Sequence, residues 1–261
     1  IGLVNKDDEH APQIIKAANC ELYTYSEESK EADFVASDIR YVSQPDFVGT
    51  EFHISGKYDM EVRLGIPGLF NVVNALAAVS VCSFLGLDQA RISHALEHIR
   101  VNGRMEIVYT SERCTVLVDY AHNAVSMESL LSTLRDYKPK RLVCVFGCGG
   151  NRSKDRRYSM GEIGGKMADL SIITADNSRY EKVEDIIADI RGSIEKTGGK
   201  FIEIPDRREA IRYSILHAQP GDMVAVIGKG HEDYQEINGV RHHFLDREVI
   251  EETVKELGEK A

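Results

Sequence analysis

The stretch that decides the class of the fold is Leu142-Val143-Cys144-Val145-Phe146-Gly147-Cys148-Gly149-Gly150. Its apolar first half, rich in valine, is typical of a strand that is buried on both faces of a sheet. The glycines that follow allow a sharp turn and a close approach of backbone amides to a ligand. Three further runs have the same buried-strand character, at Thr115–Val118, Leu170–Thr174 and Met223–Ile227.

Helical patterns separate these apolar runs. They lie near Val125–Tyr137, Met160–Met167, Val183–Ile194 and Arg207–His217, and a charged helix over Asp246–Glu259 closes the chain. Strands that alternate with helices imply right-handed crossovers between parallel strands. We therefore predict an α/β fold with a doubly wound sheet in this half of the chain.

The first hundred residues have a different character, so we place a domain boundary at about residue 102. The start predicts a strand, a helix and a strand, over Gly2–Val4, Glu9–Asn19 and Glu21–Tyr23. Three alternating stretches predict an antiparallel meander: Phe34–Val42, Phe47–Ser55 and Tyr58–Leu64. Two helices follow, over Phe70–Phe84 and from an N-cap at Asp88 to about His98.

Composition excludes several classes of protein. Of 261 residues, 32 are Lys or Arg and 42 are Asp or Glu, so the formal net charge is −10. A net-acidic chain is a poor non-specific binder of nucleic acid or of anionic membranes. No apolar run is long enough for a transmembrane helix, and five scattered cysteines without zinc spacing indicate reduced thiols. We expect a cytoplasmic protein with no nucleic-acid or membrane partner, and we assign no metal ligand.

In a doubly wound sheet, ligands bind at the carboxyl ends of the strands. Four loops leave the predicted buried strands there: Asp119–His122, Gly147–Arg152, Asp176–Arg179 and Gly228–Glu232. Each loop is polar or rich in glycine. We therefore expect one ligand site built from all four.

The chemistry of the loops points to a charged ligand. The glycines at 147–150 and the basic residues that follow suit an anion, although a solvated turn would look the same. Arg179 could clamp a carboxylate while Asp176 receives an ammonium group, which suits an amino acid; the alternative is an Asx-type turn. Asp119 and His122 could take part in catalysis, but a lone Asp–His pair is more often a hydrogen-bonded fixture. The sequence contains neither GxxxxGK[ST] nor a GxGxxG after the first strand of the second domain, so no nucleotide loop of those kinds is present.

Six segments resemble, in the same order, motifs of the Mur ligase family. They are Gly68–Ala78, Gly103–Glu106, Asp119–His122, Phe146–Gly150, Asp176–Arg179 and Gly228–Glu232. The resemblance implies that residues 1–102 are the C-terminal part of the family's central ATP-binding domain and residues 103–261 its Rossmann-like C-terminal domain. The P-loop, the UDP-sugar domain and most magnesium ligands would then lie upstream of Ile1, and we expect this fragment to be inactive as a ligase alone.

The resemblance also implies a reaction. It is an ATP- and Mg²⁺-dependent amide-bond formation that adds meso-2,6-diaminopimelate to UDP-MurNAc-L-Ala-D-Glu, through an acyl phosphate, in peptidoglycan precursor synthesis. The partners would be these small molecules, and we expect a monomer. The implied ATP-binding residues are Asn71, Asn74, Arg104, Asp119 and His122. The implied residues for the incoming amino acid are Arg152, Asp176, Asn177, Ser178, Arg179, Gly228 and Glu232. No residue of this chain is assigned a catalytic role.

Arg179 favours diaminopimelate, because an arginine at this place marks the diaminopimelate-adding members of the family. Ser178 stands where the family usually has proline, Asn151 where it has aspartate, and Asn123-Ala124 where it has Thr-Pro. The serine leaves L-lysine or another diamino acid as an alternative. A folylpolyglutamate-type ligase and a non-catalytic Mur-ligase-like binding module also remain open, and an upstream P-loop would exclude the module.

Overall fold

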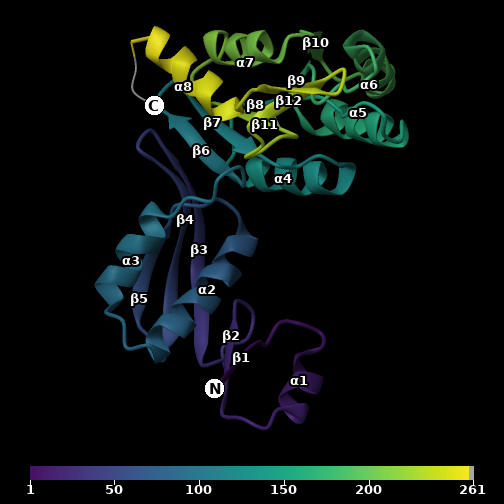
Figure 1. The fold of residues 1–261 in the computed structure, drawn as a ribbon. Helices are drawn as coiled ribbons and strands as arrows, with labels where there is room; N and C mark the ends of the chain where they lie inside the picture. Colours follow the sequence, from purple (N-terminus) through teal and green to yellow (C-terminus); the bar gives the residue numbers. More distant parts are fainter. Residues whose placement is uncertain (259–261) are drawn as a thin grey trace. The chain divides into compact units, whose positions relative to one another are not determined.

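The computed structural model describes residues 1–258. The chain divides into two compact units, one formed by residues 1–43 and 47–100 and the other by residues 44–46 and 101 onward (Figure 1). Each unit has its own sheet and hydrophobic core. Among the described residues, no helix is both long and apolar enough to cross a membrane.

The first unit is built on a sheet whose strand order is β1-β2-β3-β4-β5. The strands are β1 (Gly2–Asn5), β2 (Leu22–Ser26), β3 (Phe34–Gln44), β4 (Phe47–Gly56) and β5 (Met60–Leu64). The β1–β2 and β2–β3 pairs are parallel, whereas β4 and β5 are antiparallel.

Three helices belong to this unit: α1 (Ala11–Ala17), α2 (Leu69–Phe84) and α3 (Gln89–His98). Helix α2 lays Val72, Leu76 and Val79 against the core, where they meet the sheet residues Phe34 and Phe52. The predicted N-cap of α3 is confirmed, because the Asp88 carboxylate accepts a hydrogen bond from the Arg91 amide at 3.3 Å.

Within residues 101–258, the second unit contains a six-stranded sheet of order β10-β9-β8-β11-β7-β6. Its strands are β6 (Glu106–Thr110), β7 (Cys114–Asp119), β8 (Arg141–Phe146), β9 (Leu170–Ile173), β10 (Phe201–Glu203) and β11 (Asp222–Ile227). The four predicted buried strands are confirmed as β7, β8, β9 and β11, and all pairs are parallel except β6 with β7. The sequence patterns did not predict β6 and β10, because the apolar part of each edge strand is only two or three residues long.

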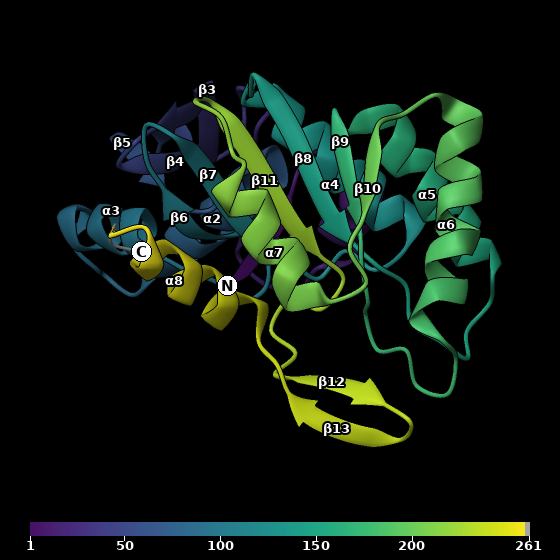
Figure 2. The same cartoon turned by 90° about the horizontal axis from the view of Figure 1, so that it is seen from above.

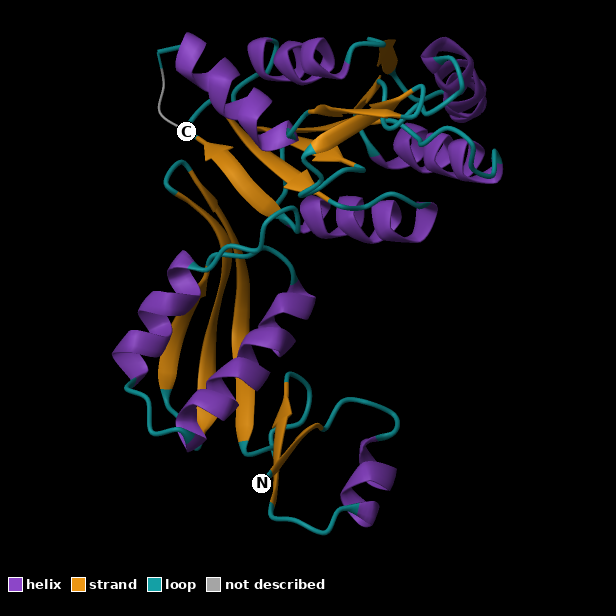
Figure 3. Ribbon diagram, in the orientation of Figure 1, coloured by secondary structure: helices purple, strands orange, loops and turns teal. Residues whose placement is uncertain are grey.

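Helices cover both faces of this sheet (Figures 2 and 3). They are α4 (Ala124–Asp136), α5 (Asp155–Met167), α6 (Val183–Thr197), α7 (Arg207–Leu216) and α8 (Asp246–Glu256). Helices α7 and α8 pack on one face, and α4, α5 and α6 on the other. The doubly wound α/β prediction is therefore correct. Helix α5 begins five residues before the predicted start, because its first turns are polar and show no apolar period. The predicted end of the last helix at Glu259 lies outside the described residues.

A small two-stranded sheet follows β11. It pairs β12 (Tyr234–Ile237) with β13 (Val240–His243) in antiparallel register, and Figure 2 shows this hairpin standing away from the main sheet. An isolated bridge between Arg179 and Ile237 connects it to the loop after β9. The hairpin was not anticipated from the sequence, and it helps to form the site.

Candidate functional site

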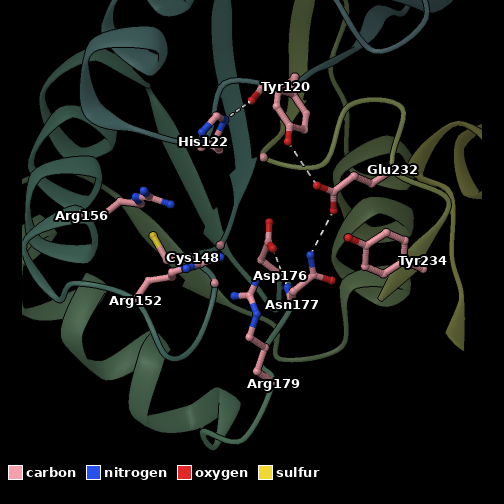
Figure 4. Close-up of a pocket in the computed structure, with 13 residues that line it drawn as sticks. Tyr120, His122, Cys148, Arg152, Arg156, Asp176, Asn177, Arg179, Glu232 and Tyr234 are labelled. Carbon is pink, nitrogen blue, oxygen red and sulfur yellow. Dashed lines mark hydrogen bonds between the residues drawn. The ribbon is translucent and has the colours of Figure 1, made fainter. Parts of the chain in front are cut away.

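The four loops predicted to build a ligand site do converge, at the carboxyl ends of β7, β8, β9 and β11. They enclose a cavity of about 390 Å³ (Figure 4), a size within the range of small-molecule sites. The cavity is lined by Tyr120, His122, Gly147, Cys148, Gly149, Arg152, Arg156, Asp176, Asn177, Arg179, Gly228, Glu232 and Tyr234.

Hydrogen bonds join the loops across the cavity. The Asn177 side chain, after β9, donates from Nδ2 to Oε2 of Glu232, after β11, at 3.0 Å. The Tyr120 hydroxyl, after β7, donates to Oε1 of Glu232 at 3.4 Å. Glu232 is therefore held by residues from two other loops, and its carboxylate faces the cavity (Figure 4).

Arg179 is positioned by its backbone as much as by its side chain. Its φ is 51°, its amide donates to the carbonyl of Glu236 at 3.0 Å, and its carbonyl accepts from the amide of Asn238 at 2.6 Å. The guanidinium donates from Nη1 to the carbonyl of Gly150 at 2.8 Å, and its Nε lies 3.5 Å from the Glu236 carboxylate. Because the side chain remains 22% exposed and lines the cavity, these contacts orient the guanidinium without sealing it off.

The glycines let the loops approach one another. A Cβ on Gly150 would lie 2.0 Å from the carbonyl oxygen of Ser178, and one on Gly147 would lie 2.1 Å from that of Thr174. Gly228 has a φ of 112°, and a Cβ there would lie 2.8 Å from Oδ2 of Asp176. The glycine run after β8 is thus required by loop packing, a reason that only the folded structure reveals.

The cavity presents both signs of charge. Guanidinium groups come from Arg152, Arg156 and Arg179, and carboxylates from Asp176 and Glu232. Arg156 forms no ion pair within residues 1–258, which leaves it available to a ligand. Opposite charges in one cavity suit a ligand that carries both carboxylate and ammonium groups.

The Cys148 thiol lies in the cavity wall but is only 3% exposed. Burial raises the pKa of this thiol to about 12, so it stays protonated near neutral pH and is not a nucleophile. Its Sγ lies 3.7 Å from the sulfur of Met160. Cys148 is therefore a packing thiol in this structure.

Two predicted residues lie at the edge of the site. Asp119 is buried at the end of β7, where it accepts hydrogen bonds from the amides of Met105 at 2.8 Å and Ala121 at 2.7 Å. Burial raises the pKa of its carboxyl, and these two amides and Arg104 oppose that rise. Asp119 is therefore a hydrogen-bonded fixture in this structure. The Arg104 guanidinium stacks 5.0 Å from the ring centroid of Tyr120.

The remaining predicted residues lie in three places: in the cavity lining, inside a loop, or in the first unit of the chain. His122 lines the cavity, and its Nδ1 lies 2.9 Å from the Tyr120 carbonyl oxygen. Ser178 is buried, 3% exposed, and lies outside the cavity lining. Asn71 and Asn74 belong to α2 of the first unit, where Asn71 donates to the Pro67 carbonyl at 2.7 Å.

Tyr120, Cys148 and Lys229 lie in the predicted loops but were not singled out as site residues. Arg156 was predicted only as one of the basic residues that follow the glycines, with no assigned ligand group. Tyr234 had no signal, because it belongs to the unpredicted hairpin. Within residues 1–258, no group of three or more His, Cys, Asp or Glu side chains could hold a metal ion.

Comparison with known proteins places the chain in one family. A model of the Mur ligase middle domain matches residues 1–82, and a model of the glutamate ligase domain of Mur ligases matches residues 103–230. The chain belongs to the Mur ligase family. Its second unit has that family's C-terminal fold.

The curated relatives are named for one reaction. A protein of Trichormus variabilis is 42% identical over 250 residues, which are 94% of this chain and 50% of that protein. One of Caldanaerobacter subterraneus subsp. tengcongensis is 38% identical over 259 residues, which are 97% of this chain and 52% of that protein. Both are named UDP-N-acetylmuramoyl-L-alanyl-D-glutamate–2,6-diaminopimelate ligase. The chain spans about half the length of the curated relatives it matches.

Solved structures of Mur ligases are also similar to this chain. A structure with the same ligase name has a TM-score of 0.79 and 35% identity, and the match covers 99% of this chain and 53% of that one. The UDP-N-acetylmuramate-alanine ligase of Thermotoga maritima has a TM-score of 0.63 at 19% identity, over 98% of this chain and 51% of that one. The second likeness concerns the fold alone.

Proposed function

We propose that this chain is the part of an ATP-dependent ligase that binds the incoming amino acid, and that this amino acid is meso-2,6-diaminopimelate. One observation carries the proposal: guanidinium groups and carboxylates line a single cavity at the carboxyl edge of the sheet. A guanidinium can hold a carboxylate through two parallel hydrogen bonds, and a carboxylate accepts from an ammonium group. A zwitterionic amino acid matches both.

The number of cations favours a ligand with two carboxylates. Arg152 follows β8 and Arg179 follows β9, so the cavity receives guanidinium groups from two different loops. Diaminopimelate carries a carboxylate and an amino group at each end, whereas lysine has only one carboxylate. Lysine would leave a guanidinium without a partner, and a site built for a polar group rejects analogues that lack it. The names of the relatives support the same choice.

The acceptor in this proposal is UDP-MurNAc-L-Ala-D-Glu, and the reaction belongs to peptidoglycan precursor synthesis in the cytoplasm. ATP with Mg²⁺ supplies activation of the acceptor carboxylate as an acyl phosphate. The residues of this chain do not by themselves form a site for ATP and Mg²⁺, because the sequence has no P-loop motif and residues 1–258 gather no metal-ligand cluster. We assign to this chain the binding and orientation of the amino acid.

The contacts with ATP assigned to Asn71, Asn74, Arg104, Asp119 and His122 stay predictions, as does the monomeric state. Stacked on Tyr120, which lines the cavity, Arg104 is well placed to contact a second substrate beside the amino acid. Asp119 would act indirectly, through the two backbone amides that it holds.

A competition experiment tests the proposal. The complete gene product that carries this chain is given UDP-MurNAc-L-Ala-D-Glu, ATP, Mg²⁺ and equal concentrations of meso-diaminopimelate and L-lysine, and the products are separated by mass. We expect the diaminopimelate product to exceed the lysine product about a hundredfold or more. Lysine incorporation at an equal or higher rate would overturn the choice of amino acid, and no product with either would favour a non-catalytic module.

A further inference from the structure

Lys229 is a buried cation beneath the cavity. It lies between Gly228 and Gly230 in the loop after β11, and its side chain is 0% exposed. It is absent from the cavity lining, yet its ammonium donates to three residues that line the cavity. The ammonium Nζ donates to Oδ1 of Asn177 at 3.3 Å, to Oε2 of Glu232 at 3.2 Å, and to the carbonyl of Tyr234.

These contacts determine which way the Asn177 amide faces. An ammonium group only donates, so the side-chain oxygen of Asn177 must face Lys229. The same oxygen also accepts from the Glu236 amide at 2.9 Å. The amide nitrogen is then left to donate to Glu232, as it does at 3.0 Å.

The contacts also decide which oxygen of Glu232 is available. Oε2 accepts from both Lys229 and Asn177, whereas Oε1 accepts from the hydroxyl of Tyr120 at the long distance of 3.4 Å. One oxygen of Glu232 is thus engaged by Lys229 and Asn177, and the other faces the cavity.

We infer that Lys229 is a positioning residue: its buried ammonium turns the Glu232 carboxylate so that Oε1 receives an ammonium group of the bound amino acid. This inference rests on the proposed function. Lys229 does not touch the ligand. It acts through Glu232 and Asn177, and its bond to the Tyr234 carbonyl anchors the start of the hairpin whose Glu236 lies beside Arg179.

The test removes the ammonium and keeps the side chain's length. In the complete gene product, Lys229→Met should raise the KM for meso-diaminopimelate about thirtyfold or more, the order expected when one partner of a buried charge pair in a binding site is lost. The KM for ATP should stay unchanged. Lys200→Met is the matched control, because Lys200 is exposed at the opposite edge of the sheet, before β10. Lys229→Gln serves as the second variant, since the glutamine amide can still donate hydrogen bonds but carries no charge.

A double-mutant cycle separates positioning from general support of the fold. If Lys229 acts through Glu232, Lys229→Met should cost much less binding in a Glu232→Gln background than alone, because the group it positions is already altered. Multiplicative effects on the KM would overturn the inference. A lower unfolding temperature with an unchanged KM, or failure of both Lys229 variants to fold, would assign Lys229 a structural role and would also overturn it. If the unaltered protein neither binds nor incorporates diaminopimelate, it is the proposed function that fails.

Discussion

The guanidinium of Arg207 forms two hydrogen bonds of 2.7 Å with the carboxylate of Asp246, and neither side chain reaches solvent. Arg207 begins α7 and Asp246 begins α8. The same guanidinium donates to the carbonyls of Ala175 at 3.2 Å and Ile227 at 3.0 Å. These carbonyls lie where the chain leaves β9 and β11, so one buried ion pair holds the bases of two loops of the site.

We predict that Arg207→Met destabilises the protein by about 3–5 kcal/mol, because it leaves the Asp246 charge buried without a partner. Urea unfolding monitored by circular dichroism measures the change. Arg208→Met is the control: Arg208 pairs with Glu252 at the surface, and such a pair contributes about 0–1 kcal/mol. A double variant, Arg207→Met with Asp246→Leu, should lose less stability than Arg207→Met alone. Equal losses in the two Arg207 variants would contradict this account.

Gly150→Ala should weaken binding of the amino acid and destabilise the protein by about 1–3 kcal/mol, because the new methyl group would overlap the Ser178 carbonyl and separate the loops after β8 and β9. Gly192→Ala is the control. Gly192 lies inside α6, and a Cβ there meets nothing within 4 Å, so the change should stabilise the helix by about 0.5–1 kcal/mol. Thermal unfolding and calorimetric titration with diaminopimelate measure both effects. Normal binding by Gly150→Ala would show that this loop contact is dispensable.

Arg179→Met in the complete gene product should raise the KM for meso-diaminopimelate about thirtyfold or more while leaving the KM for ATP nearly unchanged, since the guanidinium faces the cavity that we propose binds the amino acid. Steady-state kinetics with each substrate varied in turn distinguishes the two constants. The control is Arg191→Met, which removes an exposed guanidinium on α6 that pairs with Glu195 and Glu203. An unmoved KM for the amino acid would remove Arg179 from the site.

Stability should fall in acid through the carboxylates around Arg157. The amide of Asn151 and then the Arg157 guanidinium hold the pKa of Glu181 below its usual value. Burial opposes the shift at Asp189, but Lys154 and Arg157 hold its pKa low as well. Since the folded protein binds fewer protons at both groups, their contribution is complete above the unfolded pKa values of about 4. It is lost as the pH falls through the lower folded values.

The unfolding temperature of the protein should therefore decline as the pH is lowered below about 4.5. Arg157→Met, which removes the shared guanidinium, should flatten this decline. An equally steep decline in the variant would show that other carboxylates control the acid transition.

The sequence was sufficient for the parts of the fold that depend on local pattern. Strands β7, β8, β9 and β11 were predictable because strands buried on both faces must be continuously apolar. The position of the site followed from them, since parallel strands bring their carboxyl-end loops to one edge. Asp176, Asn177, Arg179 and Glu232 were found in this way and do line the cavity. The edge strand β10 was not predicted, because a strand of three residues is too short to show a recognisable sequence pattern.

The tertiary structure alone decided how those side chains are held. Burial and charge pairing depend on which distant segments meet, as when Arg207 meets Asp246, 39 residues away, or Lys229 becomes enclosed beneath Asn177 and Glu232. Asp119 had two interpretations from sequence, and the amides of Met105 and Ala121 make it a fixture. Residue type and spacing along the chain therefore determined which groups reach the site. Packing between separate elements determined which of these side chains are exposed to a ligand and which are buried and hold the exposed ones in place. Solvent exclusion is a property of the folded protein and not of any local segment.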